Sequence, residues 1–405
     1  MAVGIYPPDE LYPVKGVKIV STYCGIKQNS VKHDLVLFEL SDQSNVAAVF
    51  TTNKFCAAPV TLAKINLHKA SPRYLLINSG NANAGTGEEG FNNALSICQC
   101  VAHQAGVDET CVLPFSTGVI GAQLPVDIIN TAIPSLINRL NSDEAYDNWI
   151  SAAKGIMTTD TIEKAISQQI EVSGKTITIT GICKGSGMIK PDMATMLAYV
   201  ATDAEISQSE LQVCLDQVVN KSFNAITVDG DTSTNDACVL IATGESQVSV
   251  SSEHAPFMQA LTALFVHLAQ AIVRDGEGAT KFIEIQVDHA DSTSDARELA
   301  YTIAHSPLVK TAMFASDANW GRILAAIGRA PVKLTIDKVD LYLGDTCLIV
   351  QGLPDKNYTE DKGRAEMAKQ DILIRVDLNI GEASSTIWTT DLSYDYVKIN
   401  AEYRS

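Results

Sequence analysis

A single threonine stands between a glycine-flanked lead-in and a strongly apolar run in GSGMIKPDMATMLAYVATDA, residues 185–204. A threonine hydroxyl is a weak nucleophile unless a base lies beside it, and its own α-amino group is one such base. That amine has a pKa near ~7.7–8.0 and becomes available once the preceding peptide bond is cut. The small Ala194 lets Thr195 attack the carbonyl before it. A core helix or strand explains the same apolar pattern, so residue chemistry alone leaves both interpretations open.

Four further loops are rich in Gly, Asn and Thr, and each follows an apolar segment. Taken singly, each is typical of a turn. Taken together, their small residues offer several backbone N–H groups that a ligand can approach closely. We therefore expect these loops to line a cleft: NSGNANAGTG (78–87), FSTGVIG (115–121), TVDGDTSTND (227–236) and RDGEGATK (274–281).

Local patterns for other chemistries are missing from the sequence. Gly174-Lys175-Thr176 ends like a phosphate-binding loop but lacks the glycine five residues earlier. The seven histidines are dispersed, and neither H-E-x-x-H nor C-x-x-C occurs. Cys98 and Cys100 form the closest cysteine pair, where an apolar helical context favours buried thiols over zinc. The local sequence therefore indicates neither a His-based metal site nor a Ser-His-Asp triad, although a triad can still assemble in space.

The composition excludes several classes of partner. The chain has 405 residues, enough for one large or two medium domains, and a formal net charge of −17. This charge repels phosphate backbones and anionic lipids, and no run of Lys or Arg offsets it. The N-terminus lacks a basic and apolar signal pattern, and the apolar segment 261–273 is too short to span a bilayer. We expect no nucleic-acid or membrane partner and a reducing, cytoplasmic location.

Strand and helix patterns alternate along the chain without a regular βαβ rhythm, which predicts a mixed α/β (α+β) fold rather than a dinucleotide-binding fold. Short apolar runs predict strands at 35–40, 46–52, 74–80, 175–182, 281–287, 333–343, 371–378 and 385–392. Helical periodicity predicts helices at 91–106, 126–140, 207–223 and 255–276, with Pro134 as a kink or boundary and Ser207 to Glu210 as a capping box.

The segment 184–204 resembles the self-cleavage and nucleophile segment of the ornithine acetyltransferase / N-acetylglutamate synthase (ArgJ) family of arginine biosynthesis. Other stretches resemble family segments in the same order, so the resemblance covers essentially the whole chain. They are TTN, NSGNANAGTG, STGVIG, IMTTDT, ITVDGDTSTND, DGEGATK, SDANWGRILAAIGR and YVKINAEYRS.

This resemblance implies a layered α-β-β-α fold of the ornithine acetyltransferase / aminopeptidase-like, N-terminal-nucleophile type. It implies that the precursor cuts itself between Ala194 and Thr195. The products would be an α chain, 1–194, with the oxyanion-hole loop, and a β chain, 195–405, whose C-terminal tail contributes to the site. The two chains would remain associated, usually as an α2β2 heterotetramer.

The resemblance also assigns site residues. Thr195 matches the nucleophile, and Thr117 and Gly118 match the oxyanion-hole pair. A hydroxyl and a backbone N–H make chemical sense there, since one such donor is worth ~2.7–4 kcal/mol of transition-state stabilisation. The substrate-binding positions are Thr158, Lys184, Thr195, Glu277, Asn400 and Ser405.

Two points about these substrate-binding positions remain open. Thr159 is an alternative to Thr158, because the two adjoin in the same motif. Lys184 has the right charge for a substrate carboxylate and Glu277 for the ornithine ammonium. That allocation of charges is a hypothesis drawn from the residues.

The implied reaction transfers acetyl from N2-acetylornithine to glutamate through an acetylated Thr195, with acetyl-CoA as an alternative donor in bifunctional members. Two other interpretations stay open. A related N-terminal-nucleophile amidase or aminopeptidase would deacylate with water. A non-enzymatic protein would hold a small anion in the glycine loops and keep Thr195 in its core.

Overall fold

The computed structural model describes residues 2–8, 10–27, 30–142, 149–190 and 196–402. It divides into two compact units. The larger comprises residues 7–224 and 231–272, and the smaller comprises 1–6, 225–230 and 273–405. The predicted α and β chains are defined by a cut peptide bond rather than by packing, so that division stays a prediction.

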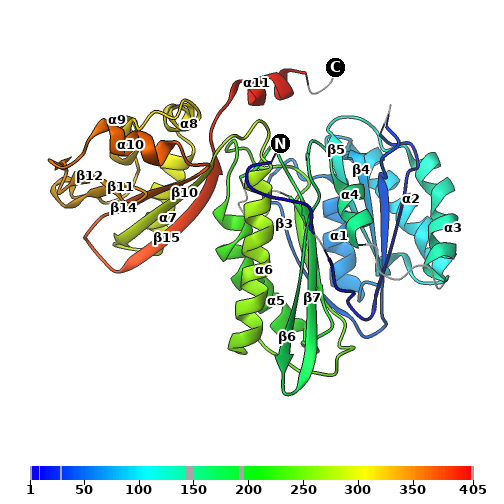
Figure 1. The fold of residues 1–405 in the computed structure, drawn as a ribbon. Helices are drawn as coiled ribbons and strands as arrows, with labels where there is room; N and C mark the ends of the chain where they lie inside the picture. Colours follow the sequence, from blue (N-terminus) through cyan, green and yellow to red (C-terminus); the bar gives the residue numbers. More distant parts are fainter. Residues whose placement is uncertain (1, 9, 28–29, 143–148, 191–195, 403–405) are drawn as a thin grey trace. The chain divides into compact units, whose positions relative to one another are not determined.

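The larger unit contains two sheets within its described residues, drawn in Figure 1. The first has the strand order β1-β2-β4-β5 and the second β3-β9-β8-β7-β6; β4 and β5 are parallel, as are β8 and β9. The strands are β1 (Val17–Thr22), β2 (Leu35–Leu40), β3 (Asn45–Phe50), β4 (Tyr74–Asn81), β5 (Val112–Val119), β6 (Lys164–Val172), β7 (Lys175–Lys184), β8 (Leu197–Thr202) and β9 (Ala237–Ala242). The helices are α1 (Ala58–Lys69), α2 (Gly87–Ala105), α3 (Val126–Leu140), α4 (Trp149–Ile156), α5 (Gln208–Lys221) and α6 (Ala255–Arg274), with 3-10 turns η1 (Glu109–Cys111) and η3 (Phe223–Ala225).

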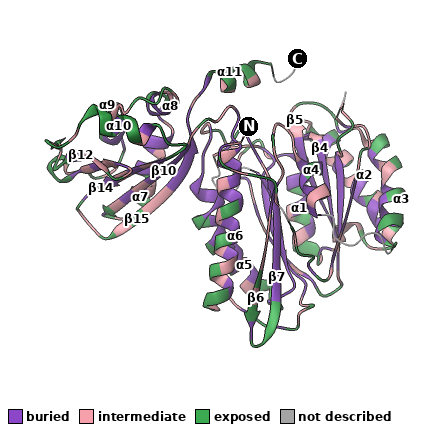
Figure 2. Cartoon of the chain, in the orientation of Figure 1, coloured by how far each residue is buried: buried purple, intermediate pink, exposed green. Residues whose placement is uncertain are grey.

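The two sheets pack face to face through one apolar core. Tyr199 of β8 meets Phe38 of β2 and Phe115 of β5, with ring centroids 5.6 Å and 5.3 Å apart. Helices α2 and α3 cover the outer face of the first sheet with a second apolar cluster. On the other sheet, Gly181 of β7 lies against Leu264 and Leu268 of α6. The expected layered α-β-β-α order is therefore confirmed, and Figure 2 shows buried residues along β4 and β7 with an exposed β6–β7 tip.

The smaller unit is built on a sheet of order β13-β12-β11-β14-β10-β15 in its described residues. Strands β10 and β14 are parallel, and the other neighbouring strands of this sheet are antiparallel. Helix α7 packs on β10 and β15. Its strands are β10 (Phe282–Ala290), β11 (Asp340–Leu343), β12 (Thr346–Val350), β13 (Leu353–Pro354), β14 (Asp371–Asp377) and β15 (Ala383–Thr390). Its helices are α7 (Thr293–Ala304), α8 (Pro307–Phe314), α9 (Trp320–Gly328), η4 (Ile336–Lys338), α10 (Glu360–Met367) and α11 (Tyr394–Ala401).

Three local predictions about helices need correction. Helix α3 runs through Pro134 without ending, so this proline is not a boundary, whereas a kink there stays a prediction. Proline cannot donate to the carbonyl four residues earlier, and that Asn130 oxygen instead lies 3.8 Å from the Cys100 thiol of α2. The capping box is half formed: Ser207 accepts from the Glu210 N–H, whereas the Glu210 carboxylate accepts from Ser252. Helix α6 ends at Arg274, before the predicted glycine.

The predicted strand 333–343 is also wrong over its first half, which forms the turn η4 before β11 begins at Asp340. Its backbone carbonyls have other donors, because Val339 O accepts from Gly352 N–H and Lys338 O accepts from the Asn379 amide. These bonds remove Lys338 and Val339 from any ladder.

One helix in the described part of the chain, α6, is long and apolar enough to cross a membrane. The apolar segment is thus longer than the sequence suggested. Its 18-residue apolar window is 56% buried, with Leu264, Phe265 and Leu268 fully covered. The helix is therefore a core element of the larger unit, and its length and composition are weak evidence for a membrane span.

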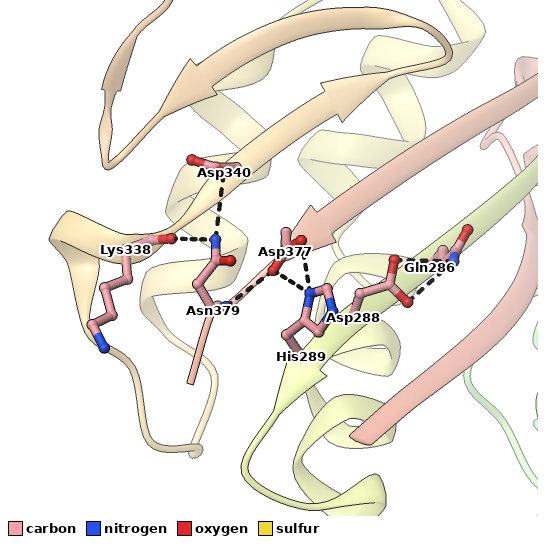
Figure 3. Close-up of polar contacts among 7 residues, drawn as sticks. All are labelled: Gln286, Asp288, His289, Lys338, Asp340, Asp377 and Asn379. Atoms are coloured by element: carbon pink, nitrogen blue, oxygen red, sulfur yellow. Dashed lines mark hydrogen bonds and ion pairs between the residues drawn. The ribbon is translucent and has the colours of Figure 1, made fainter. Parts of the chain in front are cut away.

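A bulge near the end of β10 is held by a histidine–aspartate pair (Figure 3). His289 has a positive φ of 51°, and its Nδ1 lies 2.9 Å from each carboxylate oxygen of Asp377 on β14. Asn379 extends the contact, since its backbone N–H donates to Asp377 and its amide to Lys338 O. The hydrogen bond and charge of Asp377 raise the pKa of His289, and Asp288 and Glu382 add smaller effects.

We predict that His289 titrates above the ordinary histidine value of about 6.5. Because the pKa of His289 is higher in the folded state, its protonated form stabilises the fold at pH values below the unfolded-state pKa. This stabilisation is lost as the pH rises through the folded-state pKa. Asp377→Asn should lower the His289 pKa more than Asp288→Asn does, because Asp377 makes the direct bond. Imidazole NMR titration measures both variants, and equal effects would contradict the assignment.

Candidate active site

The predicted oxyanion pair lies at the C-terminal end of β5, beside the end of the parallel strand β4. Gly118 has a φ of 135° and pairs with Gly80. A methyl group at Gly118 would collide with the Gly80 backbone, so only glycine fits this close approach. Thr117 is 6% exposed and directly precedes it. The Thr117 hydroxyl and the closely packed Gly118 backbone are therefore neighbours at the C-terminal end of β5.

One buried side chain ties three of the glycine-rich loops together. The Asn235 amide donates to Ala82 O (2.5 Å) and to Ser116 O (2.9 Å), joining TVDGDTSTND to NSGNANAGTG and FSTGVIG. Asn78 also accepts from the Ser116 hydroxyl at 2.5 Å. Because these loops share hydrogen bonds, three of the four loops meet within the larger unit, and the predicted cleft lined by 78–87, 115–121, 227–236 and 274–281 stays a prediction.

The TTN segment closes the same network from a different strand. The Thr51 backbone N–H donates to Asp236 O, and its hydroxyl donates to Ser233 O at 2.7 Å. The Asn53 amide donates to Thr232 O at 2.8 Å. These bonds fix the loop before β9 from its other side.

Thr158 and Lys184, the predicted substrate-binding residues of this unit, are in contact. The Lys184 Nζ donates to the Thr158 hydroxyl at 3.3 Å, and both residues are half-buried. Asp160 accepts from the Thr158 backbone N–H at 2.9 Å and from the Gly185 N–H at 2.7 Å. One carboxylate therefore positions both segments.

The Asp160 carboxylate is itself held by Lys164, whose Nζ lies 2.6 Å away with both side chains fully buried. Burial alone would raise the pKa of Asp160, because it disfavours the charged carboxylate. The charges of Lys164 and Lys184, together with the hydrogen bonds, outweigh this effect and hold the pKa of Asp160 below its usual value. Asp160 lies in the stretch IMTTDT, but no sequence pattern pairs it with Lys164. Its spacing of four residues suggests a helix, whereas Lys164 begins β6.

In the smaller unit, Glu277 and Asn400 are also in contact. The Asn400 amide donates to the Glu277 carboxylate at 2.8 Å and to Tyr396 O at 3.0 Å. Glu277 is 8% exposed, and Asn400 lies on α11. The structure thus brings this predicted pair together and leaves the glutamate nearly covered by its own chain.

The turn that carries Glu277 is fastened to the start of α11. Gly278 has a φ of 68°, and its carbonyl accepts from the Ser393 hydroxyl at 2.6 Å. Asp391 accepts from the backbone N–H groups of Thr280 and Lys281 at 2.8 and 2.9 Å. This arrangement explains why a C-terminal residue can contact residue 277, although chain ends usually fray.

Ala194, Thr195 and Ser405 lie outside the described residues. The strand that follows residue 195 is described: β8 is buried along its whole length, and Ala237 donates its N–H to Met196 O at 3.0 Å. The apolar run is therefore a central strand, not a helix.

Two further ionisable groups of the larger unit are buried. Asp236 is fully covered, and burial raises the pKa of its carboxyl well above its usual value, with Ser233 and Lys184 opposing. Cys98 lies in the α2 core, where burial raises the pKa of its thiol. No cluster of three or more His, Cys, Asp or Glu suited to a metal occurs among the residues that the structure describes.

The larger unit is thus a layered α-β-β-α protein in which glycine-rich loops converge at the ends of central strands. The model of the ArgJ family matches residues 18–405, and the chain belongs to that family. It is 51% identical over 411 residues, the full length of both chains, to the "Arginine biosynthesis bifunctional protein ArgJ" of Pseudomonas syringae pv. tomato. The identity is also 51% over 412 residues to the protein of that name from Psychrobacter arcticus, again over both full lengths. The crystal structure of the Bacillus halodurans protein of that name is 42% identical, covers 50% of this chain and 96% of its own, and has a TM-score of 0.48.

Asp160→Asn should destabilise the larger unit by about 3–5 kcal/mol, because it leaves the buried Lys164 ammonium without its counterion. Urea unfolding measures the change in free energy. Because the pKa of Asp160 is lowered in the folded state, its ionised carboxylate stabilises the fold at pH values above the pKa of an unfolded carboxyl group. This stabilisation is lost as the pH falls through the folded-state pKa of Asp160.

The matched control is Lys154→Ala, which breaks the 3.5 Å pair with Glu163 on a lysine that is 57% exposed. Such pairs contribute about 0–1 kcal/mol. A similar loss in the two variants would show that Asp160 does not organise this region.

Proposed function

We propose that this chain is a glutamate N-acetyltransferase of arginine biosynthesis, which moves acetyl from N2-acetylornithine to glutamate. This proposal rests on the 51% identity, over the full length of the chain, to proteins named as arginine biosynthesis bifunctional proteins. Their bifunctional name supports a second activity, in which acetyl-CoA acetylates glutamate. The reaction needs no metal or organic cofactor.

In this proposal the precursor cuts itself between Ala194 and Thr195, and the new α-amine then serves as the base for the Thr195 hydroxyl. Thr195 Oγ attacks the amide carbonyl of acetylornithine, and the amine takes the hydroxyl proton. Thr117 and Gly118 stabilise the oxyanion. The carbon–nitrogen bond breaks, the ornithine nitrogen takes the proton, and acetyl stays on Thr195. Glutamate's neutral amine then attacks the ester carbonyl, the bond between the acetyl carbon and Thr195 Oγ breaks, and a proton passes from the glutamate nitrogen through the α-amine to Thr195 Oγ as N-acetylglutamate leaves.

Substrate recognition is assigned to Thr158, Lys184, Thr195, Glu277, Asn400 and Ser405. The Lys184 ammonium suits a carboxylate, and the Glu277 carboxylate suits the ornithine ammonium. The contact of Lys184 with Thr158 and that of Asn400 with Glu277 support each pair acting together. The two chains, 1–194 and 195–405, are proposed to stay together as an α2β2 assembly in the cytoplasm.

The test of this function begins with intact mass under denaturing conditions, where we expect two chains, 1–194 and 195–405. Thr195→Ala should stay uncut and inactive, because it removes the attacking hydroxyl. Incubation with acetylornithine should release ornithine and, when glutamate is added, form N-acetylglutamate.

Other outcomes identify the alternatives. An amidase would release free acetate at the same rate with or without glutamate. A non-enzymatic binding protein would remain one chain and leave acetylornithine intact. Normal processing of Thr195→Ala would refute the nucleophile assignment.

Glu277→Gln should raise the KM for acetylornithine about tenfold to a hundredfold, since a hydrogen bond to a charged group contributes about 1.5–3 kcal/mol. Steady-state kinetics measures this change. The amide retains an oxygen for Asn400, so the local fold should survive. Glu360→Gln, in the exposed first turn of α10, is the matched control. Unchanged constants in Glu277→Gln would sink the allocation of charges.

A further inference from the structure

A second lysine of the larger unit reaches the region of Gly118 and Lys184. The loop that follows β1 wraps around the buried Asp34 carboxylate, which accepts backbone N–H groups from residues 24, 25, 26 and 27 at 2.7–3.1 Å. Four such bonds fix the loop tightly, because hydrogen bonds to a charged acceptor are the strong ones. The backbone position of Lys27 is therefore fixed by these hydrogen bonds to Asp34.

This loop lays Lys27 across the strand that supports the candidate oxyanion hole. A methyl group at Gly80 would lie 3.1 Å from Lys27 Cγ, so the lysine stem covers Gly80. Gly80 in turn pairs with Gly118 at the ends of β4 and β5. Lys27 is thus separated from the Gly118 backbone by a single glycine.

The Lys27 ammonium has a neutral hydrogen-bond partner. Its Nζ donates to a neutral acceptor, His33 O, at 3.0 Å, and no ion pair of Lys27 occurs among the residues that the structure describes. The charged groups that act on it are Asp34, Lys32, Asp160 and Lys184. Asp34 is occupied by the loop backbone and Asp160 by Lys164, so both carboxylates already serve the fold.

Burial and the nearby lysines lower the pKa of Lys27 to about 8, against the attraction of the carboxylates. Two ammonium groups within electrostatic range repel each other, and an anionic ligand relieves that repulsion. Glutamate in its nucleophilic form has a neutral amine and two carboxylates, whereas acetylornithine has one carboxylate and one ammonium. The region therefore favours glutamate by charge.

We propose that Lys27 is a specificity-determining residue that binds the second carboxylate of the acceptor, glutamate, beside the paired ends of β4 and β5. The inference rests on the proposed acetyl transfer and deepens it. Lys27 then contributes to the half-reaction in which glutamate takes the acetyl group and little to the half-reaction in which acetylornithine gives it.

The experiment compares the two half-reactions in the full-length, processed protein. Lys27→Met should raise the KM for glutamate about tenfold to a hundredfold and leave the single-turnover release of ornithine from acetylornithine within about twofold. Lys27→Arg should keep most of the glutamate affinity, because its guanidinium retains the charge. Lys32→Met, which changes an exposed lysine of the same segment, should leave the glutamate KM at neutral pH unchanged.

Glutamine provides a readout that a purely structural role would not move. Wild type should prefer glutamate over glutamine as acceptor, and Lys27→Met should lose about tenfold or more of that preference. The glutamate KM of wild type should rise as pH increases through about 8, where Lys27 loses its proton, and that rise should be absent from Lys27→Met.

The outcomes separate this inference from the function beneath it. If wild type transfers acetyl but Lys27→Met slows both half-reactions equally, or leaves glutamate preference unchanged, Lys27 does not select the acceptor. If wild type transfers no acetyl from acetylornithine to glutamate, the proposed function itself fails.

Discussion

The Asp160 carboxylate is the constraint on which the larger unit's candidate site depends. It accepts hydrogen bonds from the backbone N–H groups of Thr158 and Gly185. The buried ammonium of Lys164 neutralises its charge. A buried ion pair contributes little net stability when compared with apolar packing. Its value here is geometric, because it holds two segments 25 residues apart in one arrangement.

A second constraint is the close approach of backbones at the ends of β4 and β5. Gly80 and Gly118 exclude side chains, and the Asn235 amide then binds the carbonyls that such close packing would leave unpaired. The loops are rich in Gly and Asn for these two reasons. Polar groups that are fully bonded in this way are rigid, which is what a site needs to act on a substrate without reorganising.

The sequence predicted the strands and helices well where the apolar period was regular, as in β7 and α2, and the glycine stop at Gly106 is confirmed by its left-handed conformation. It failed at 333–339, where the carbonyls of Lys338 and Val339 bond to distant residues, and no local pattern records such partners. The motifs identified the loops that converge, but the role of Asp160 depends on bonds made across the fold. Lys27 carried no signal either, because its position follows from Asp34 and Gly80.

The strand order of the second sheet has a consequence for any cut before residue 195. Strands β8 and β9 occupy the middle of that sheet, with β3 on one side and β7 and β6 on the other. The flanking strands come from residues before the cut and the central two from residues after it. The two pieces would therefore be interleaved within one hydrogen-bonded sheet, and neither could leave without unfolding the other. Cleavage in this fold would create a new chain end while leaving a single, inseparable folding unit.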